Sequence, residues 1–393
     1  MKKIALSSLS LALIGAAGVA HAQSSVTLYG IIDTSITYVN HADGGKNQWS
    51  VSNSNSGDLS GTRWGLKGQE DLGGGLATIF QLENGFDPGN GKLGQGQREF
   101  GRQAFVGLQS NQFGTVTLGR QYDPLIDLVQ GITADNYFGS VFATAGDVDN
   151  YDNSFRVNNA IKYTSPTYAG FQVEALYAFG GVAGKTSSGQ TWSFAAAYNN
   201  GPIGVAAGYL LTDNANSPAR NTWTSTGSSA AVSSTSDGTF DGPVNSGYAT
   251  AKSIGIARVA AQYTLGAFTF GAGYSNAQYK ADGFSAFHST EKYNTGQGFL
   301  NYQATPALLL GLGYSYTKSS GDTSATYHQV SAGADYNLSK RTDVYLVGAW
   351  QHASGDTGDG AGGKVAAQAS VGSYGYAGTS NQTLVSLGLR HKF

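Results

Sequence analysis

Hydrophobic and polar residues alternate with a period of two along much of the chain. Residues 268–275 read Phe-Thr-Phe-Gly-Ala-Gly-Tyr-Ser, and similar alternation recurs in 308–317, 171–179 and 385–393. Because successive side chains of a strand point to opposite faces, each stretch predicts a strand with one apolar and one small or polar face. A water-soluble sandwich would have to fill its core with that second face, and Gly, Ser, Thr and Gln fill a core badly. The pattern therefore favours a barrel with lipid outside and water inside.

The same alternation and the turns between the stretches place about 16 strands along the chain. We expect strands at 24–39, 62–70, 75–86, 98–109, 113–121, 156–166, 169–179, 191–200, 202–211, 252–264, 267–279, 294–303, 306–317, 326–337, 341–352 and 380–393. Short connections alternate with long polar ones, of which the longest are 122–155, 212–251 and 353–379. This alternation is typical of outer-membrane barrels, and a barrel of this size leaves an aqueous channel. The fold class expected is an all-β, antiparallel transmembrane barrel of the porin type.

The first residues predict an export signal. Lys2 and Lys3 precede an apolar stretch at 9–19, and Ala-His-Ala at 20–22 offers a small-x-small cleavage pattern. The apolar stretch is too short to cross a membrane as a helix. We therefore expect a signal peptide at 1–22 and one barrel domain at 23–393.

Composition excludes several classes of function. The 23 basic and 25 acidic residues show no basic excess, which argues against nucleic-acid binding. The sequence has no cysteine, so no disulfide framework holds the exported chain. The spacing of acidic residues and histidines matches no metal-ligand pattern. We expect neither a metal nor another cofactor.

Six stretches resemble the trimeric general porins of Gram-negative bacteria, especially their β-proteobacterial branch. They are Ser-Val-Thr-Leu-Tyr-Gly at 25–30, Arg-Trp-Gly-Leu-Lys-Gly-Gln-Glu-Asp-Leu-Gly at 63–73, Arg-Gln-Ala-Phe-Val-Gly-Leu at 102–108, Phe-Gly-Thr-Val-Thr-Leu-Gly-Arg-Gln at 113–121, Asn-Ala-Ile-Lys-Tyr at 159–163 and Gly-Leu-Arg-His-Lys-Phe at 388–393. The resemblance covers essentially the whole chain after residue 22. It implies 16 strands, a homotrimer and a third loop folded into the lumen.

The same resemblance implies a function and several partners. The expected function is passive diffusion of ions and small hydrophilic solutes through a water-filled pore in the outer membrane. The barrel would contact outer-membrane lipid and lipopolysaccharide. Phe393 would help the barrel-assembly machinery to recognise the last strand.

Basic residues on inward faces are candidates for the narrow part of the pore, because rings of charge decide which ions pass. Arg63 and Lys67 share a face opposite Trp64 and Leu66. In the predicted strand 156–166, Arg156 and Lys162 lie on the polar face. The resemblance implies an arginine cluster at the positions of Arg63, Arg102 and Arg156.

Parity gives separate placements for Arg102 and for one further arginine, Arg120. Arg102 shares a face with Ala104 and Val106, which leaves Phe105 facing lipid. Arg120 has the parity of apolar neighbours, which puts it on the outer face or at the entry to the third loop. For Arg120 a subunit interface is therefore favoured over the pore.

Acidic candidates for the pore come mainly from the predicted third loop. In the enterobacterial porins this loop carries Pro-Glu-Phe-Gly-Gly, whereas this chain has Tyr-Phe-Gly-Ser at 137–140 and lacks the glutamate. Asp127 and Asp135 are the candidates for its role, although aspartates here could equally hold the loop in place. Asp33, on the inner face of the first strand, is a further candidate for the lumen.

Three other functions compete with a general porin. A channel selective for anions or carboxylates remains open, because arginines favour anions while the acidic loop opposes them, and the sign does not follow from sequence. An outer-membrane enzyme would need a nucleophile, base and orienting group, but the histidines at 41, 288, 328, 352 and 391 show no such spacing. A secreted β-adhesin conflicts with the alternation of loop lengths.

Overall fold

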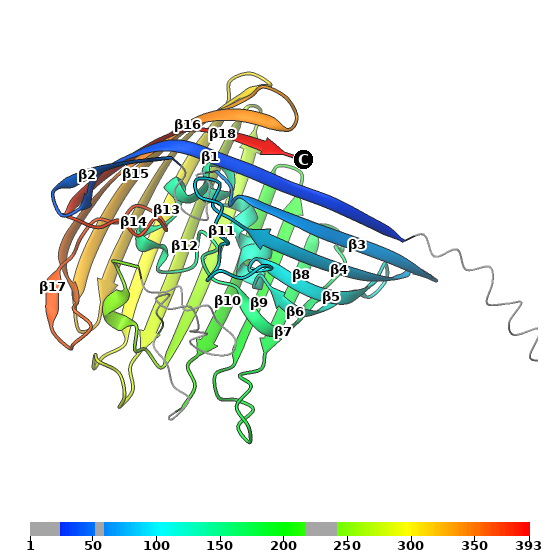
Figure 1. The fold of residues 1–393 in the computed structure, drawn as a ribbon, viewed down its shortest axis with the longest axis horizontal. Helices are drawn as coiled ribbons and strands as arrows, with labels where there is room; N and C mark the ends of the chain where they lie inside the picture. Colours follow the sequence, from blue (N-terminus) through cyan, green and yellow to red (C-terminus); the bar gives the residue numbers. More distant parts are fainter. Residues whose placement is uncertain (1–23, 52–58, 217–222, 224–241) are drawn as a thin grey trace, which may run out of the picture.

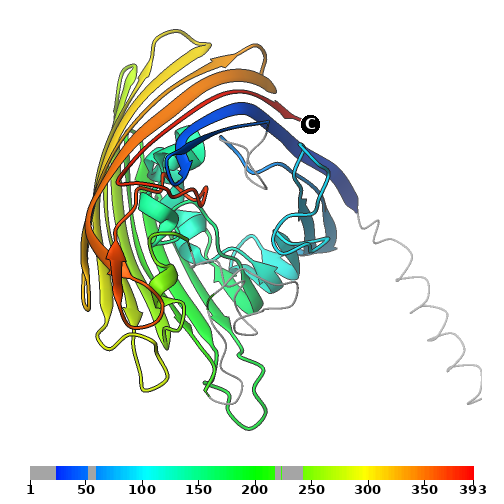
Figure 2. The ribbon, with the colours of Figure 1, turned by 60° about the vertical axis from the view of Figure 1, so that its left-hand side comes forward.

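The computed structural model describes residues 24–51, 59–216, 223 and 242–393, and the predicted signal peptide at 1–22 lies outside these ranges. Within them, 18 strands form one antiparallel sheet, and 16 of these follow one another around a closed barrel (Figures 1 and 2). The barrel strands are β1 (Ser25–Asp43), β3 (Arg63–Gly73), β4 (Leu76–Gly85), β5 (Gln103–Ser110), β6 (Gly114–Gln121), β7 (Val157–Thr164), β8 (Phe171–Ala178), β9 (Thr191–Asn200), β10 (Ile203–Asp213), β11 (Ser253–Leu265), β12 (Phe268–Lys280), β13 (Glu291–Gln303), β14 (Leu308–Ser320), β15 (Ser324–Asn337), β16 (Thr342–Gly358) and β18 (Asn381–Lys392). The predicted barrel of 16 strands is confirmed.

Two short strands and several boundaries differ from the prediction. β2 (Lys46–Val51) pairs with β1, and β17 (Lys364–Ala366) pairs with β16, so that these barrel strands extend into long connections. β5 begins at Gln103, five residues later than the predicted start at 98. The last residue before β5 is therefore Arg102, and the last before β7 is Arg156.

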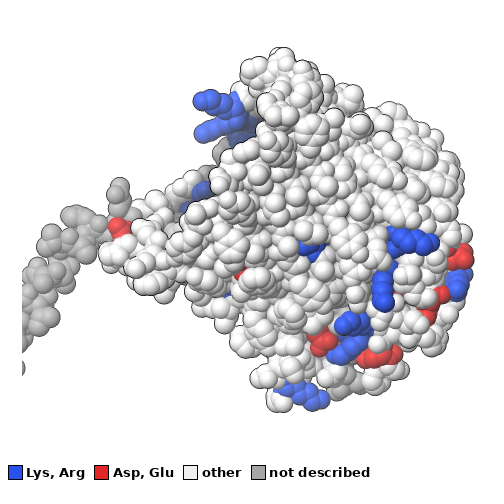
Figure 3. Space-filling model, turned by 180° about the vertical axis from the view of Figure 1, so that it is seen from behind, with Lys and Arg blue, Asp and Glu red and all other residues white. Residues whose placement is uncertain are grey.

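The faces of the strands follow the predicted alternation. Phe268, Phe270 and Tyr274 on β12 are 41%, 46% and 47% exposed, whereas Ser275 next to them is 2% exposed. A broad surface of the barrel carries few charged side chains; many of those in view lie at the lower right, and a basic group stands at the upper left (Figure 3). An apolar outer face of this kind suits contact with lipid.

No helix in the described part of the chain is long and apolar enough to cross a membrane.

The barrel closes where β18 meets β1. The register runs from Ile31 opposite Lys392 to Val39 opposite Leu384. Beyond it, the backbone N–H of Gly30 donates to the carbonyl of Phe393 at 3.1 Å, and that of Phe393 donates to Gly30 at 3.0 Å. The first and last strands therefore seal the sheet down to the final residue.

On its other side, β1 changes partner. Residues 25–31 pair with β3 and residues 36–43 pair with β2, which leaves a break in the ladder around Asp33. Thr62 bridges this break, since its Oγ1 accepts a hydrogen bond from the Asp33 N–H at 3.0 Å and donates to the Asp33 carbonyl at 2.7 Å. The threonine thus satisfies backbone groups that would otherwise be left unpaired in a buried position.

The connection between β6 and β7 contains five short helical elements, and residues 122–156 are called the β6–β7 segment. The elements are η1 (Leu125–Val129), η2 (Gln130–Ile132), α2 (Ala134–Phe138), η3 (Gly139–Phe142) and η4 (Ala145–Asp147). Phe138 is fully buried over Gly311 and Gly333, where a Cβ atom would come within 2.0 and 2.4 Å of its ring. Two wall glycines therefore form a seat for this ring.

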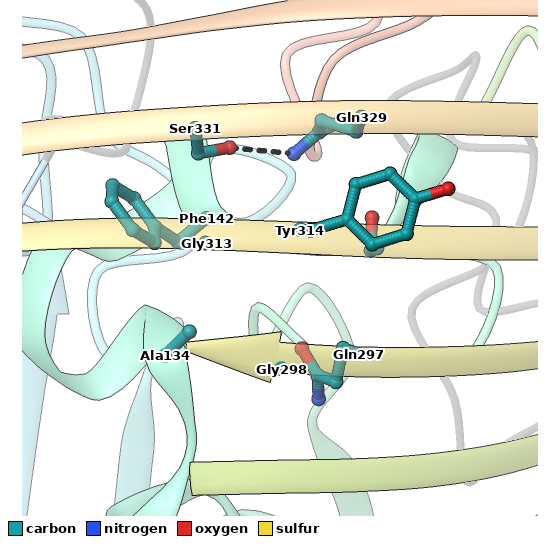
Figure 4. Close-up of a pocket in the computed structure, with 9 residues that line it drawn as sticks. Ala134, Phe142, Gln297, Gly298, Gly313, Tyr314, Gln329 and Ser331 are labelled. Carbon is teal, nitrogen blue, oxygen red and sulfur yellow. Dashed lines mark hydrogen bonds between the residues drawn. The ribbon is translucent and has the colours of Figure 1, made fainter. Parts of the chain in front are cut away.

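Hydrogen bonds hold the same part of the segment to the wall. Nε2 of Gln329 on β15 donates to the carbonyls of Val141 and Ala143 at 3.1 and 2.8 Å, and Ser331 donates to Val141 at 2.7 Å. A small cavity beside these contacts is lined by residues that include Ala134, Gln329 and Ser331 (Figure 4). The packing of the Phe138 ring and these hydrogen bonds together fix the segment on β14 and β15.

Candidate functional site

Charged and aromatic side chains gather around the carboxylate of Glu83 on β4. Nε of Arg102 donates to Oε1 at 2.8 Å, and Nε of Arg63 lies 3.7 Å from Oε2. The hydroxyls of Tyr29 and Tyr122 donate to the two carboxylate oxygens at 2.8 and 3.1 Å. These residues, together with Arg156, are called the Glu83 cluster below.

The register of the first strands explains why the cluster forms. Gly65 on β3 lies opposite Tyr29 on one side and opposite Glu83 on the other. A Cβ atom at Gly65 would come 2.7 Å from the Tyr29 hydroxyl. Because this position is glycine, Tyr29 reaches across β3 to the carboxylate of Glu83.

Arg102 reaches Glu83 from outside its strand. Its backbone N–H donates to the Glu83 carbonyl at 3.1 Å, and the residue is 7% exposed. The predicted faces of its neighbours on β5 were wrong: Val106 is 50% exposed on the outer side, and Phe105 lies opposite Gln81, whose Nε2 donates to Tyr29 at 2.7 Å. The alternation of β5 does not extend to Arg102, since the strand begins one residue later.

Arg156 joins the cluster through an aromatic ring. Its guanidinium carbon lies 5.4 Å from the ring centroid of Tyr122, and that of Arg102 lies 5.8 Å from the same centroid. Arg156 also donates from Nη1 to the Ser154 carbonyl at 3.2 Å and is 5% exposed. The structure therefore brings Arg63, Arg102 and Arg156 to one site.

A second group of charges lies next to the cluster. Nζ of Lys162 on β7 forms an ion pair with Asp127 of η1 and donates to the Tyr122 carbonyl at 3.2 Å. Glu174 on β8 is buried nearby and accepts a hydrogen bond from Thr164 at 2.8 Å. The positive charge of Lys162 is thus offset by the negative charge of Asp127.

Asp135 lies elsewhere. Its carboxylate accepts hydrogen bonds from Thr133 Oγ1 at 2.5 Å and Gln130 Nε2 at 2.6 Å, and the residue is 4% exposed. Burial raises the pKa of this carboxyl to about 7. Asp135 is therefore held within the β6–β7 segment, and these hydrogen bonds do not join it to the arginines of the Glu83 cluster.

Asp33 and Lys67 have different surroundings. The Asp33 carboxylate is fully buried and accepts hydrogen bonds from the N–H groups of Leu59 and Ser60 and from the Tyr345 hydroxyl. These contacts hold the chain that leads into β3. Lys67 is exposed, with its Nζ 5.3 Å from the centroid of the Tyr29 ring. Lys67 thus borders the Glu83 cluster, while Asp33 has a structural role.

Arg120 is bound within its own chain. Its guanidinium donates to the Gly101 carbonyl from Nε at 2.8 Å and to the Asn158 side chain from Nη1 at 2.5 Å, and the residue is 9% exposed. It therefore ties the approach to β5 to strand β7.

Sequence reasoning missed Glu83, Tyr29 and Tyr122. A signal for Glu83 existed, because the short turn after β3 sets the hairpin register and puts Glu83 opposite Gly65, two residues from Arg63. Two further charged sites were also missed. Arg258 is buried over Tyr151, and Arg390 forms ion pairs with Asp335 and Asp343.

Comparison with known proteins identifies the family. A family model described as Gram-negative porin matches residues 7–356. An outer membrane porin protein of Bordetella pertussis is 30% identical over the full length of both chains. Outer membrane porin protein 32 of Delftia acidovorans is 36% identical over 53% of this chain and 59% of its own.

A solved structure supports the same assignment. An anion-selective porin from Comamonas acidovorans matches with a TM-score of 0.71 and 25% identity, over 94% of this chain and 100% of its own. The family model, the named relatives and the barrel fold all indicate a channel in the outer membrane of a Gram-negative bacterium. They do not support the alternatives of an enzyme or an adhesin. The chain belongs to the Gram-negative porin family.

Proposed function

We propose that this porin passes small anions more readily than cations, and that the Glu83 cluster lines the narrow part of its pore. The observation that carries the proposal is the imbalance of charge in the cluster. Three guanidinium groups, those of Arg63, Arg102 and Arg156, gather at the carboxylate of Glu83. One further acid, Asp152 of the β6–β7 segment, interacts electrostatically with Arg156, so the cations still outnumber the acids. A net positive site favours entry of anions, and a low-dielectric wall strengthens its field. The similar porin from Comamonas acidovorans is anion-selective, which agrees with this sign.

The β6–β7 segment supplies the other wall of the proposed constriction. Its first residue, Tyr122, belongs to the Glu83 cluster, and its Phe138 is seated on β14 and β15. A segment that joins the arginines at one end and packs on distant strands at the other would cross the lumen. We propose that it thereby narrows the pore, with Asp135 acting within the segment and Asp127 joining the segment to Lys162 on β7.

Assembly and partners follow from the family. We propose that the chain forms a homotrimer in contact with outer-membrane lipid and lipopolysaccharide, and that small hydrophilic solutes and ions pass by diffusion. Arg120 would stiffen the wall near a subunit interface by holding Gly101 and Asn158. Phe393 would be read by the barrel-assembly machinery.

The experiment is the reversal potential of single channels in a planar bilayer under a salt gradient. The wild-type protein should show anion preference, and changing Arg63, Arg102 and Arg156 together to alanine should move the reversal potential towards cations. Lys364→Ala removes one positive charge from exposed β17 and should leave the reversal potential unchanged. A triple variant with the wild-type reversal potential would overturn the proposed constriction.

A further inference from the structure

Tyr122 makes polar contacts with three charged side chains. It is the first residue after β6, where the β6–β7 segment begins. Its hydroxyl accepts a hydrogen bond from Nη2 of Arg102 at 2.7 Å and donates to Oε1 of Glu83 at 3.1 Å. Its carbonyl accepts a hydrogen bond from Nζ of Lys162 at 3.2 Å. The chemistry fixes the direction of the hydroxyl, because a guanidinium can only donate and an ionised carboxylate can only accept.

The ring of Tyr122 adds a second kind of contact. The guanidinium carbons of Arg102 and Arg156 lie 5.8 and 5.4 Å from its centroid, within the range of cation–π attraction. Two guanidinium groups close together repel each other, and long side chains lose rotamer freedom when they are ordered. A neutral ring attractive to both cations opposes this repulsion and limits the positions that they adopt.

We propose that Tyr122 is a positioning residue that sets the arrangement of the cluster's arginines and thereby the strength of anion preference. The inference rests on the proposed function, since it concerns the same pore. Tyr122 carries no charge, so replacing it changes where the cations lie and not how many there are. Its effect on selectivity is therefore separable from that of the arginines.

The test uses two variants of the full-length protein in planar bilayers. Tyr122→Phe keeps the ring and removes the hydroxyl, while Tyr122→Leu removes both. We expect the anion-to-cation permeability ratio to fall by about twofold in Tyr122→Phe and further in Tyr122→Leu, given the usual strength of one hydrogen bond and one cation–π contact. Open-channel current noise should rise in the same order, because the guanidinium groups would move more freely.

A matched control lies in the same segment. The hydroxyl of Tyr137 donates to Oε1 of Gln262 at 2.8 Å, away from the Glu83 cluster, so Tyr137→Phe removes one phenol and should keep the wild-type ratio and noise. Folding of each variant is checked by the temperature at which its barrel unfolds in detergent. If Tyr122→Leu does not fold, Tyr122→Phe still tests the role of the hydroxyl.

The outcomes separate this inference from the proposed function. A shift in Tyr122→Leu alone would assign the positioning to the ring. Equal shifts in both variants would assign it to the hydroxyl, and a larger shift in Tyr122→Leu would assign it to ring and hydroxyl together. Wild-type selectivity and noise in every folded Tyr122 variant would overturn the inference, even if the triple arginine variant changes selectivity. If the triple arginine variant does not change selectivity, the proposed function itself fails.

Discussion

Glu83 and Arg102 are joined twice, once through the backbone and once through their side chains. The N–H of Arg102 donates to the Glu83 carbonyl at 3.1 Å, and its Nε donates to the Glu83 carboxylate at 2.8 Å. Both residues are less than a tenth exposed. Arg63, in contrast, approaches the same carboxylate only to 3.7 Å. Arg102 is therefore the fixed cation of the cluster, and Arg63 is held more loosely.

Removing the central carboxylate should strengthen anion preference. Glu83→Gln keeps the size of the side chain and deletes the negative charge that offsets the arginines, so the reversal potential should move further towards anions. The backbone bond between residues 83 and 102 should survive, which limits the rearrangement of Arg102. Glu70→Gln, at an exposed position on β3, is the matched control and should have little effect. A shift towards cations in Glu83→Gln would contradict the proposed role of the cluster.

A methyl group added to the wall beneath the Phe138 ring should weaken the packing of the β6–β7 segment. A Cβ atom at Gly311 would lie 2.0 Å from the ring, so Gly311→Ala should lower the free energy of unfolding by about 1–3 kcal/mol and alter single-channel conductance. Unfolding in detergent measures the first effect and bilayer recording the second. Gly296→Ala on β13 faces open space and should leave both unchanged. Adding Phe138→Leu to Gly311→Ala should restore part of the lost stability, whereas no recovery would argue against the seat.

Raising the pH from about 4 to about 8 should destabilise the β6–β7 segment. Burial raises the pKa of Asp135 to about 7 and that of Asp147 to about 8, and Asp152 and Asp149 contribute to the rise at Asp147. Between the ordinary aspartate pKa of about 4 and these values, the folded state binds more protons than the unfolded state, so stability falls as pH rises, by at most about 1.4 kcal/mol per pH unit and group.

Unfolding temperature measured in detergent between about pH 5 and about pH 8 checks this expectation over the window in which these carboxyls titrate. Asp147→Asn removes one of the groups and should flatten the pH profile. A profile that rises towards alkaline pH would refute it.

The last residue allows a test that separates assembly from packing. The Phe393 ring lies over Gly30, where a Cβ atom would come within 2.3 Å of it. If Phe393 is read by the assembly machinery, Phe393→Ala should reduce the yield in the outer membrane of cells but not refolding from urea into detergent. Equal losses in both would indicate a packing role alone. Phe268→Ala, at another exposed phenylalanine, serves as the control.

Barrel strands were predictable because their signal is local. Lipid on one face and small or polar residues on the other impose a period of two, and the range 191–200 is the same in prediction and structure. The short hairpin strands β2 and β17 were missed because they lie in long polar connections without that alternation.

The site was only partly predictable, for physical reasons. Arg63, Arg156 and Lys162 could be placed from parity, since each lies in or next to a regular strand. Arg102, like Arg156, lies directly before its strand, but the inward positions of β5 have the opposite parity, so the alternation does not predict its contact with Glu83. In the β6–β7 segment no period applies, and the partners of Asp135 depend on how the chain folds back on itself.

The backbone hydrogen bonds between Gly30 and Phe393 extend the pairing of the first strand with the last, so the barrel can close only after the last strand has been synthesised. A chain synthesised from its N-terminus carries β1 with one open edge until its final residues exist, because the strand that covers this edge ends at residue 392. Bringing together residues so distant in sequence is entropically costly and slow. A truncated chain would keep an unpaired strand edge that lipid cannot satisfy. A porin chain that stops before β18 therefore cannot form a closed surface, and it remains an open sheet that is prone to aggregation and proteolysis.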